Sequence, residues 1–301
     1  MSNLPNGDDL PRRGAAHERR RATLRQGGFT LVELLIAVVI ALFLSAGLLT
    51  LVQAMKAGAS TQNGLSQLQD NERMAMTLIS DVVQQAGYFP NPMVNQAATE
   101  FPTSAAPVSF AGQTWSFTFP GQALVGAGAF ADPAPPAGPS NSLTVRYATA
   151  GTVVLPPALP DNIINCTGNT SAVPTTFTNT FSLVADADVP GTYDLVCSLQ
   201  DSANPGNDAV VSLVSGVTQL QVLYGVQSNT SVSNGSADCY LDAAGVNAGS
   251  YWQNVVSVKV TLTFVNPLWG TLAGQNENPG TPPTIAFTRV IDVMNKTNSS
   301  P

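Results

Sequence analysis

The 301-residue sequence contains very few of the groups that enzymes commonly use for catalysis. Its single histidine, His17, lies near the start of the chain, so the rest has no arrangement of serine, histidine and aspartate. It also has no histidine that could bind a metal or titrate near pH 7. No phosphate-cradling glycine-rich motif and no dinucleotide fingerprint is present. We therefore expect neither enzymatic activity nor a cofactor.

Cationic side chains are scarce after residue 28. Six of the 12 Lys and Arg residues lie within the first 25 positions, and only six follow. The part of the chain after residue 28 is therefore strongly acidic and lacks the positive surface that binds phosphate backbones. We expect no nucleic-acid partner.

One acidic stretch has the spacing of a calcium loop. Asp186 and Asp188 are separated by one residue, and Ca²⁺ prefers such oxygen ligands. However, Pro190 occupies a ligand position of the EF-hand pattern, and Cys197 stands where its glutamate should be. We expect a solvated acidic turn here and no bound metal.

A long apolar run dominates the N-terminal part of the chain. Residues 29–52 follow a basic stretch and contain one carboxylate, Glu33, close to their start. The run is long enough for a membrane-spanning helix, and a charge inside the hydrocarbon costs about 2.5–3.5 kcal/mol on insertion scales. Glu33 therefore needs a partner. The preceding arginines predict that the N-terminal end stays in the cytoplasm, with the bulk of the chain across the membrane.

The sequence Gly-Phe-Thr-Leu-Val-Glu, which follows the basic leader, resembles the class III signal of type IV pilins and type II secretion pseudopilins. In that family a prepilin peptidase cleaves after the glycine, here between Gly28 and Phe29, and N-methylates the new terminal residue. The resemblance implies that Glu33 neutralises the terminal amine of a neighbouring subunit. An ordinary secretory signal cleaved near 45–47 and a plain signal anchor are alternatives. Neither explains the spacing of the glycine, the phenylalanine and the glutamate.

The pattern predicts four segments. They are a leader (1–28), an apolar half of a long helix (29–52), an amphipathic half (53–87) and a periplasmic β-rich head (88–301). Apolar residues in the second half of the helix recur at helical spacing, at Leu65, Leu68, Ala75, Ile79, Val82 and Ala86. Gly87 is well placed to end the helix. Residues 58–64 are rich in poor helix formers, so we expect fraying or a bend there, with unwinding in an assembled filament as the alternative.

The head alternates short β-branched and aromatic runs with turn signals. The expected strands are 114–119, 142–148, 176–184, 192–199, 209–214, 217–226, 255–265 and 284–293. Alternation of apolar and polar residues, as at Val258 and Lys259, predicts a half-buried antiparallel strand that packs on the amphipathic helix. Residues 120–140 are expected to form a mobile loop and 237–251 a long connection. The predicted fold class is α+β and pilin-like, with a long helix packed on an antiparallel head.

Three cysteines, and no CxxC pair, lie in this head. In a periplasmic domain an odd number predicts one disulfide with one free thiol, or an intermolecular bridge. We expect Cys166 to pair with Cys197, because Cys197 lies in a strand-like run and Cys166 in the loop-rich stretch before it. Cys239 would then be free.

The C-terminal third resembles PilW-type minor pilins in residues 215–225, 252–262 and 287–295. This resemblance implies a minor pilin that takes part in type IV pilus assembly, priming or capping the pilus tip. The implied partners are the prepilin peptidase, other minor pilins, the major pilin, the inner-membrane assembly platform and the lipid bilayer. Its implied location is the inner membrane and then the pilus. A J-type minor pseudopilin of type II secretion and a tip adhesin that uses the 120–140 loop are alternatives.

Overall fold

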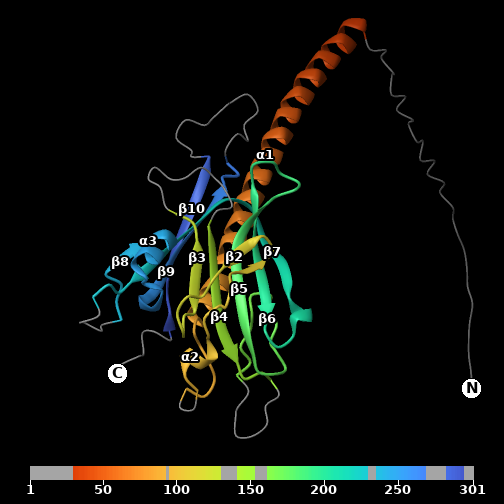
Figure 1. Cartoon of the computed structure of the whole chain (residues 1–301). Coiled ribbons are helices and arrows are strands. Elements are labelled where there is room, and N and C mark those ends of the chain that lie inside the picture. The colour runs from red at the N-terminus through yellow and green to blue at the C-terminus, as the bar shows by residue number, and fades with distance from the viewer. Residues whose placement is uncertain are drawn as a thin grey trace, which may run out of the picture. The chain divides into compact units, whose positions relative to one another are not determined.

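The expected α+β architecture is confirmed by the computed structural model, in which a long helix is followed by an antiparallel β-rich head (Figure 1). The structure describes residues 30–92, 95–129, 141–152, 161–229, 235–268 and 283–294. The chain forms two compact units, Met1–Met55 and Lys56–Pro301.

The helices and strands follow one another along the chain with short 3₁₀ turns between some of them. In order they are α1 (Leu31–Gln84), α2 (Ala97–Glu100), β1 (Val108–Phe110), β2 (Gln113–Trp115), β3 (Leu124–Ala127), β4 (Ser142–Thr149), β5 (Thr175–Ala185), β6 (Tyr193–Asp201), η1 (Pro205–Asn207), β7 (Ala209–Val226), β8 (Cys239–Leu241), α3 (Ala243–Gly249), η2 (Trp252–Asn254), β9 (Val255–Val265) and β10 (Thr284–Asp292).

The C-terminal half of α1 supplies one wall of the hydrophobic core. The predicted stripe is confirmed at Leu68, Ala75, Ile79, Val82 and Ala86, which are all buried. Sequence analysis did not pick out two further buried residues of the same face, Met76 and Val83. These side chains share one core with apolar residues from β4, β5, β6, β7, β9 and β10. The alternation predicted for β9 is confirmed from Val258 to Val265, whereas the first four residues of the strand, Ser257 included, are all buried.

The expected fraying of residues 58–64 is wrong, because α1 is helical through this stretch. Its composition lowers helix propensity, but packing in the folded chain can override propensity. A Cβ atom added at Gly64 would lie 2.9 Å from the Cβ of Pro267, so the missing side chain lets Pro267 approach the helix. Gly64, which the sequence suggested as a weak point of the helix, therefore allows a close contact with Pro267.

The helix ends as its sequence predicts. Gly87 has a φ of 72°, a left-handed value that glycine adopts readily at the end of a helix. Its N–H donates a hydrogen bond to the backbone oxygen of Arg146 in β4 (3.0 Å). The end of α1 is thus tied directly to the sheet.

The main sheet has the order β10-β9-β7-β6-β5-β4-β3, and β8 pairs with β7. Every pair in it is antiparallel. The two strands predicted at 209–214 and 217–226 are in fact one strand, β7. Its first half pairs with β6 and its second half with β9, and the exchange occurs beside Gly216, whose φ is 77°. The turn signal in the sequence therefore marks an irregularity within a strand.

Other expectations for the head need correction. Residues 114–119 do not form one strand, because only Gln113–Trp115 is extended, in a separate two-stranded ribbon with β1. The expected 120–140 loop contains β3, and the expected 237–251 connection contains β8 and α3. β3 is short and contains a glycine, so its sequence has a low propensity to form a strand. Asp242 caps the start of α3, and its side chain accepts a hydrogen bond from Gly245 N–H (2.7 Å).

Arg146 holds the segment between α1 and β3 against the sheet. The residue is only 7% exposed, and its guanidinium donates to the backbone oxygens of Gln122 (2.6 Å), Pro102 (2.9 Å) and Phe101 (3.2 Å). It also lies over the Phe117 ring, 3.8 Å from the centroid. Burial lowers the pKa of the Arg146 side chain to about 10, so it remains a cation at neutral pH. Among the described residues no carboxylate forms a salt bridge with it.

A disulfide joins Cys166, in the loop before β5, to Cys197 in β6. Both residues are buried in the core, with Cα atoms 6.4 Å apart, and they are 31 positions apart in sequence. Cys239 is a free thiol at the start of β8. The bond therefore fixes the loop before β5 to the centre of the sheet.

We predict that Arg146→Lys lowers the free energy of unfolding by about 2–4 kcal/mol, because lysine cannot donate to three carbonyls in a fork. Urea unfolding of the chain in mild detergent, followed by tryptophan fluorescence, measures the change. Arg73→Lys, on an exposed face of α1, is the control and should change stability by no more than about 0.5 kcal/mol. Equal effects of the two substitutions would contradict the role of Arg146.

We also predict that replacing both Cys166 and Cys197 by alanine lowers the free energy of unfolding by about 3–4 kcal/mol. Opening a 31-residue loop restores that much conformational entropy to the unfolded chain in the loop-closure model. The same denaturation measurement applies, with Cys239→Ala as the control. A double variant as stable as the parent chain would show that the disulfide is dispensable.

Candidate functional site

The N-terminal turn of α1 places Glu33 near the beginning of the apolar helix. Thr30 precedes the helix, and its hydroxyl oxygen accepts a hydrogen bond from Glu33 N–H (3.3 Å). A threonine followed three residues later by glutamate is a typical helix start, and a negative charge in the first turn suits the helix dipole. Gly28 and Phe29, the expected cleavage and methylation residues, lie outside the described residues.

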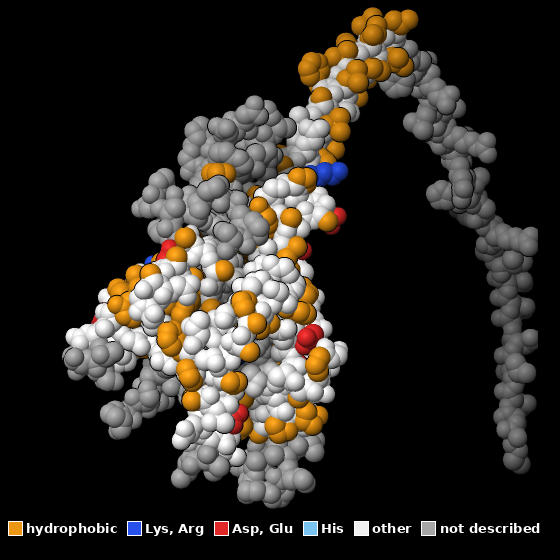
Figure 2. Space-filling model, in the orientation of Figure 1, with side chains coloured by type: hydrophobic (Ala, Val, Ile, Leu, Met, Phe, Trp, Pro, Cys, Tyr) orange, Lys and Arg blue, Asp and Glu red, His pale blue; other side chains and the backbone are white. Residues whose placement is uncertain are grey.

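The first half of α1 presents its apolar side chains on every side. Between Leu31 and Val52 the large hydrophobic residues are 40–77% exposed. Among the described residues α1 is the one helix long and apolar enough to cross a membrane, and the window that meets this test is not buried at all. Figure 2 shows these side chains covering the beginning of the helix. Such a surface is stable only when lipid or other apolar helices cover it.

The acidic loop between β5 and β6 uses its own carboxylate to hold itself together. One oxygen of Asp186 accepts hydrogen bonds from the N–H groups of Asp188 (2.8 Å) and Val189 (3.2 Å). The other oxygen accepts from the Thr192 hydroxyl (3.3 Å). No group of three or more histidine, cysteine or acidic residues that could hold a metal occurs in the described parts of the chain. The calcium-like spacing thus gives a hydrogen-bonded turn.

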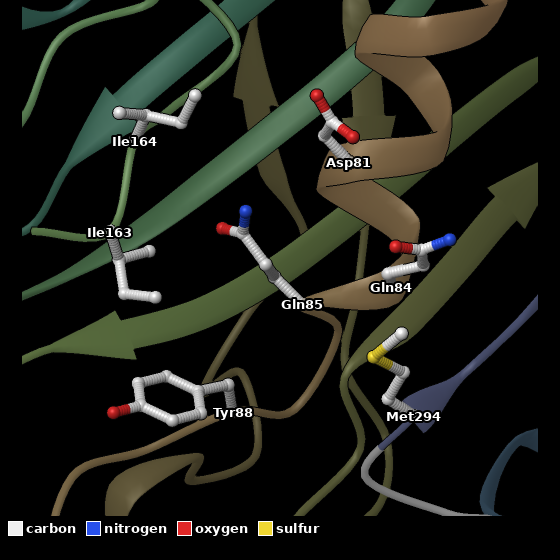
Figure 3. Close-up of a pocket in the computed structure, with 7 residues that line it drawn as sticks. All are labelled: Asp81, Gln84, Gln85, Tyr88, Ile163, Ile164 and Met294. Atoms are coloured by element: carbon white, nitrogen blue, oxygen red, sulfur yellow. The ribbon is translucent and has the colours of Figure 1, made fainter. Parts of the chain in front are cut away.

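A hollow of about 450 Å³ lies where α1 ends. Its lining residues come from the last turn of the helix and the residues just after it, from the loop before β5 and from the second residue after β10. They are Asp81, Gln84, Gln85, Tyr88, Ile163, Ile164 and Met294 (Figure 3). Burial and the neighbouring Asp161 carboxylate raise the pKa of the Tyr88 hydroxyl. A carboxylate, two amides and a phenol offer hydrogen bonds here, but this lining contains no nucleophile paired with a base.

Sequence reasoning missed two carboxylates that organise loops of the head. Asp161 accepts hydrogen bonds from the Thr149 hydroxyl (2.5 Å) and from Ala150 N–H (2.8 Å). Asp201 accepts from the Thr175 hydroxyl (2.5 Å) and three other donors. An aspartate followed by serine, asparagine or glycine is a turn signal that could have marked Asp201. Both are structural groups.

The expected adhesive loop is only partly within the described residues. Residues 124–127 form β3, an edge strand of the main sheet, and residues 130–140 lie outside the described parts. β3 pairs with β4 and also contacts β2 and α3. The described portion is therefore part of the folded head.

Two family models match the chain. Residues 23–49 match the prokaryotic N-terminal methylation motif, and residues 180–290 match PilW, the type IV pilus-assembly protein W. The second match runs from within β5 to within β10. No curated protein and no solved structure matches the chain significantly. Both matching families are structural pilus components rather than enzymes. Together the two matches support a type IV pilin-like minor pilin, most similar to the PilW-type minor pilins.

Proposed function

We propose that this minor pilin primes or caps the tip of a type IV pilus by packing its apolar helix against the helices of other pilins. The observation that carries the proposal is the exposed apolar first half of α1, with one carboxylate in its first turn, in a chain with a large β-rich head. The match to PilW over residues 180–290 supports the pilus rather than the secretion system.

The carboxylate of Glu33 is the key group in this assembly. Prepilin peptidase would cleave between Gly28 and Phe29 and methylate Phe29, which leaves a cationic amine beside the apolar helix. A charge costs several kcal/mol in an apolar environment unless it is paired, and removing one partner leaves the other charge buried. Glu33 of one subunit would therefore bind the N-terminal amine of a neighbour and set the axial register between the two helices.

The charge distribution supports a periplasmic head. Arginines crowd the residues before the apolar helix, and lysine and arginine are rare after it. A disulfide buried in the core is also typical of an oxidising compartment outside the cytoplasm. The proposed partners are accordingly the other minor pilins, the major pilin and the assembly platform in the inner membrane.

The J-type pseudopilin of type II secretion shares this plan and is the second candidate. Residues 23–49 support both systems equally, since the methylation motif is common to them. The tip-adhesin alternative rests on residues 120–140 alone. The pilus assignment is favoured because the PilW match covers most of the main sheet.

We predict that Glu33→Ala reduces the amount of this protein in sheared pili about tenfold or more, because a buried ion pair loses one partner. Quantitative immunoblots of the pilus and membrane fractions measure the ratio. Asp70→Ala, which removes an exposed carboxylate later in the same helix, is the matched control and should not change it. Normal incorporation of the Glu33 variant would refute the pairing role.

A further inference from the structure

The outer edge of β10 is a long and regular strand edge. β10 pairs with β9 over nine residues without a register shift, and it ends the main sheet. At the two ends of this ladder, Asn266 N–H donates to the oxygen of Pro283 (2.9 Å) and Val293 N–H donates to the oxygen of Val256 (2.9 Å). Antiparallel ladders alternate, so odd-numbered residues of β10 bond to β9. The N–H and C=O groups of even-numbered residues, such as Thr288, point outward.

This edge has few of the features that usually prevent strand addition. Natural edges are short, bulged, covered, or marked by charged side chains or proline. β10 contains no proline or bulge, and within the described residues no strand pairs with its outer side. Its two charged residues are Arg289, which donates hydrogen bonds to α1, and Asp292 at the end of the strand. By contrast, β3 at the opposite edge is four residues long and contacts α3 and β2. The first half of β7 is irregular, because its ladder with β6 has two register shifts.

A hollow of about 500 Å³ runs between this edge and α1. It is lined by Thr77, Ser80, Asp81 and Gln84 of α1, by the consecutive residues Arg289, Val290, Ile291 and Asp292 of β10, and by Met294. Consecutive residues of a strand point to opposite faces of the sheet. Because consecutive residues of β10 line the hollow, it lies along the edge of the strand rather than over one face. An added strand would lie about 4.8 Å from β10, in this hollow.

The charges of the hollow indicate what kind of segment fits. Asp81 and Asp292 line it, and neither forms a salt bridge within the described residues. Its one cation, Arg289, already donates to the Ser80 hydroxyl (3.2 Å) and the backbone oxygen of Met76 (3.4 Å) of α1. A second copy of this chain would bring the same carboxylates to the contact. A segment with lysine or arginine on the side facing α1 complements Asp81, and a cation at its end on the other side complements Asp292.

We propose that the outer edge of β10 binds an extended, basic segment of another pilus protein as an added antiparallel or parallel strand. This inference rests on the proposed incorporation into a pilus and identifies the surface used there. Side chains of the segment that face α1 meet Asp81 and Gln84. Those on the other face lie beside Val290, which is 51% exposed, so β-branched residues suit that side.

Amide hydrogen exchange of the full chain tests the proposal. The chain purified from membranes in mild detergent is compared with the chain in purified pili. The amides of Phe287 and Arg289 bond to β9 and should exchange slowly in both samples. The amides of Thr288 and Val290 should exchange about tenfold or more slowly in pili than in detergent. Equal exchange of these two amides in both samples overturns the proposal.

Two pairs of variants provide an independent test. Thr288→Pro removes the outward N–H of residue 288, a loss that an edge strand tolerates, whereas Thr288→Ala keeps this N–H. We expect several-fold less of the proline variant in pili and no change for the alanine variant. Val290→Lys should also reduce incorporation, whereas Val184→Lys, at an exposed position of β5, should not. If the two variants of each pair were incorporated into pili equally, the proposal would be overturned, even if the proline variant were unstable.

The remaining outcomes separate this inference from the proposed function. Parent chain that is absent from pili would contradict the proposed function and, with it, this surface. Parent chain that is present in pili with an unprotected β10 edge would contradict the surface alone. A detergent-solubilised chain of doubled mass with protected Thr288 and Val290 amides would identify a second copy as the occupant, which also overturns the proposal.

Discussion

The burial of one face of α1 against the main sheet is the interaction on which the head depends. Ala75, Met76, Ile79, Val82 and Val83 are at most 1% exposed, although they belong to a helix that is exposed elsewhere. The sheet contributes its own apolar face to the same core, so neither element can bury its hydrophobic surface alone. Arg146 and the disulfide then fasten the remaining segments to this core.

The same helix has a first half with the opposite property. Its large apolar residues are 40–77% exposed, and its surface has the composition of a membrane span. One half of α1 therefore stabilises the head, and the other half is available to lipid and to neighbouring subunits. This division fits the proposed role in pilus assembly, in which the exposed half of the helix makes the contacts.

The fold and the family could be predicted where the signal is local. The spacing of Gly28, Phe29 and Glu33 indicated the family, and the alternation around Val258 predicted β9 correctly. The rest depends on contacts between distant residues. Gly64 fits a helix because Pro267 packs against it, and Arg146 is buried because a distant segment supplies its acceptors. Nothing near either residue in the sequence specifies its partner. The outer edge of β10, with which no described strand pairs, is likewise a property of the whole sheet.

The account is tested most directly by the intact mass and N-terminal residue of the protein purified from bacterial membranes. Cleavage after Gly28 and methylation would give a chain that begins with N-methyl-Phe29, as the helical assembly requires. That result would place the terminal amine four residues before Glu33, where a neighbouring subunit can use it. A chain that begins at Met1, or near Gly47 after ordinary signal cleavage, would contradict the proposed assembly mechanism.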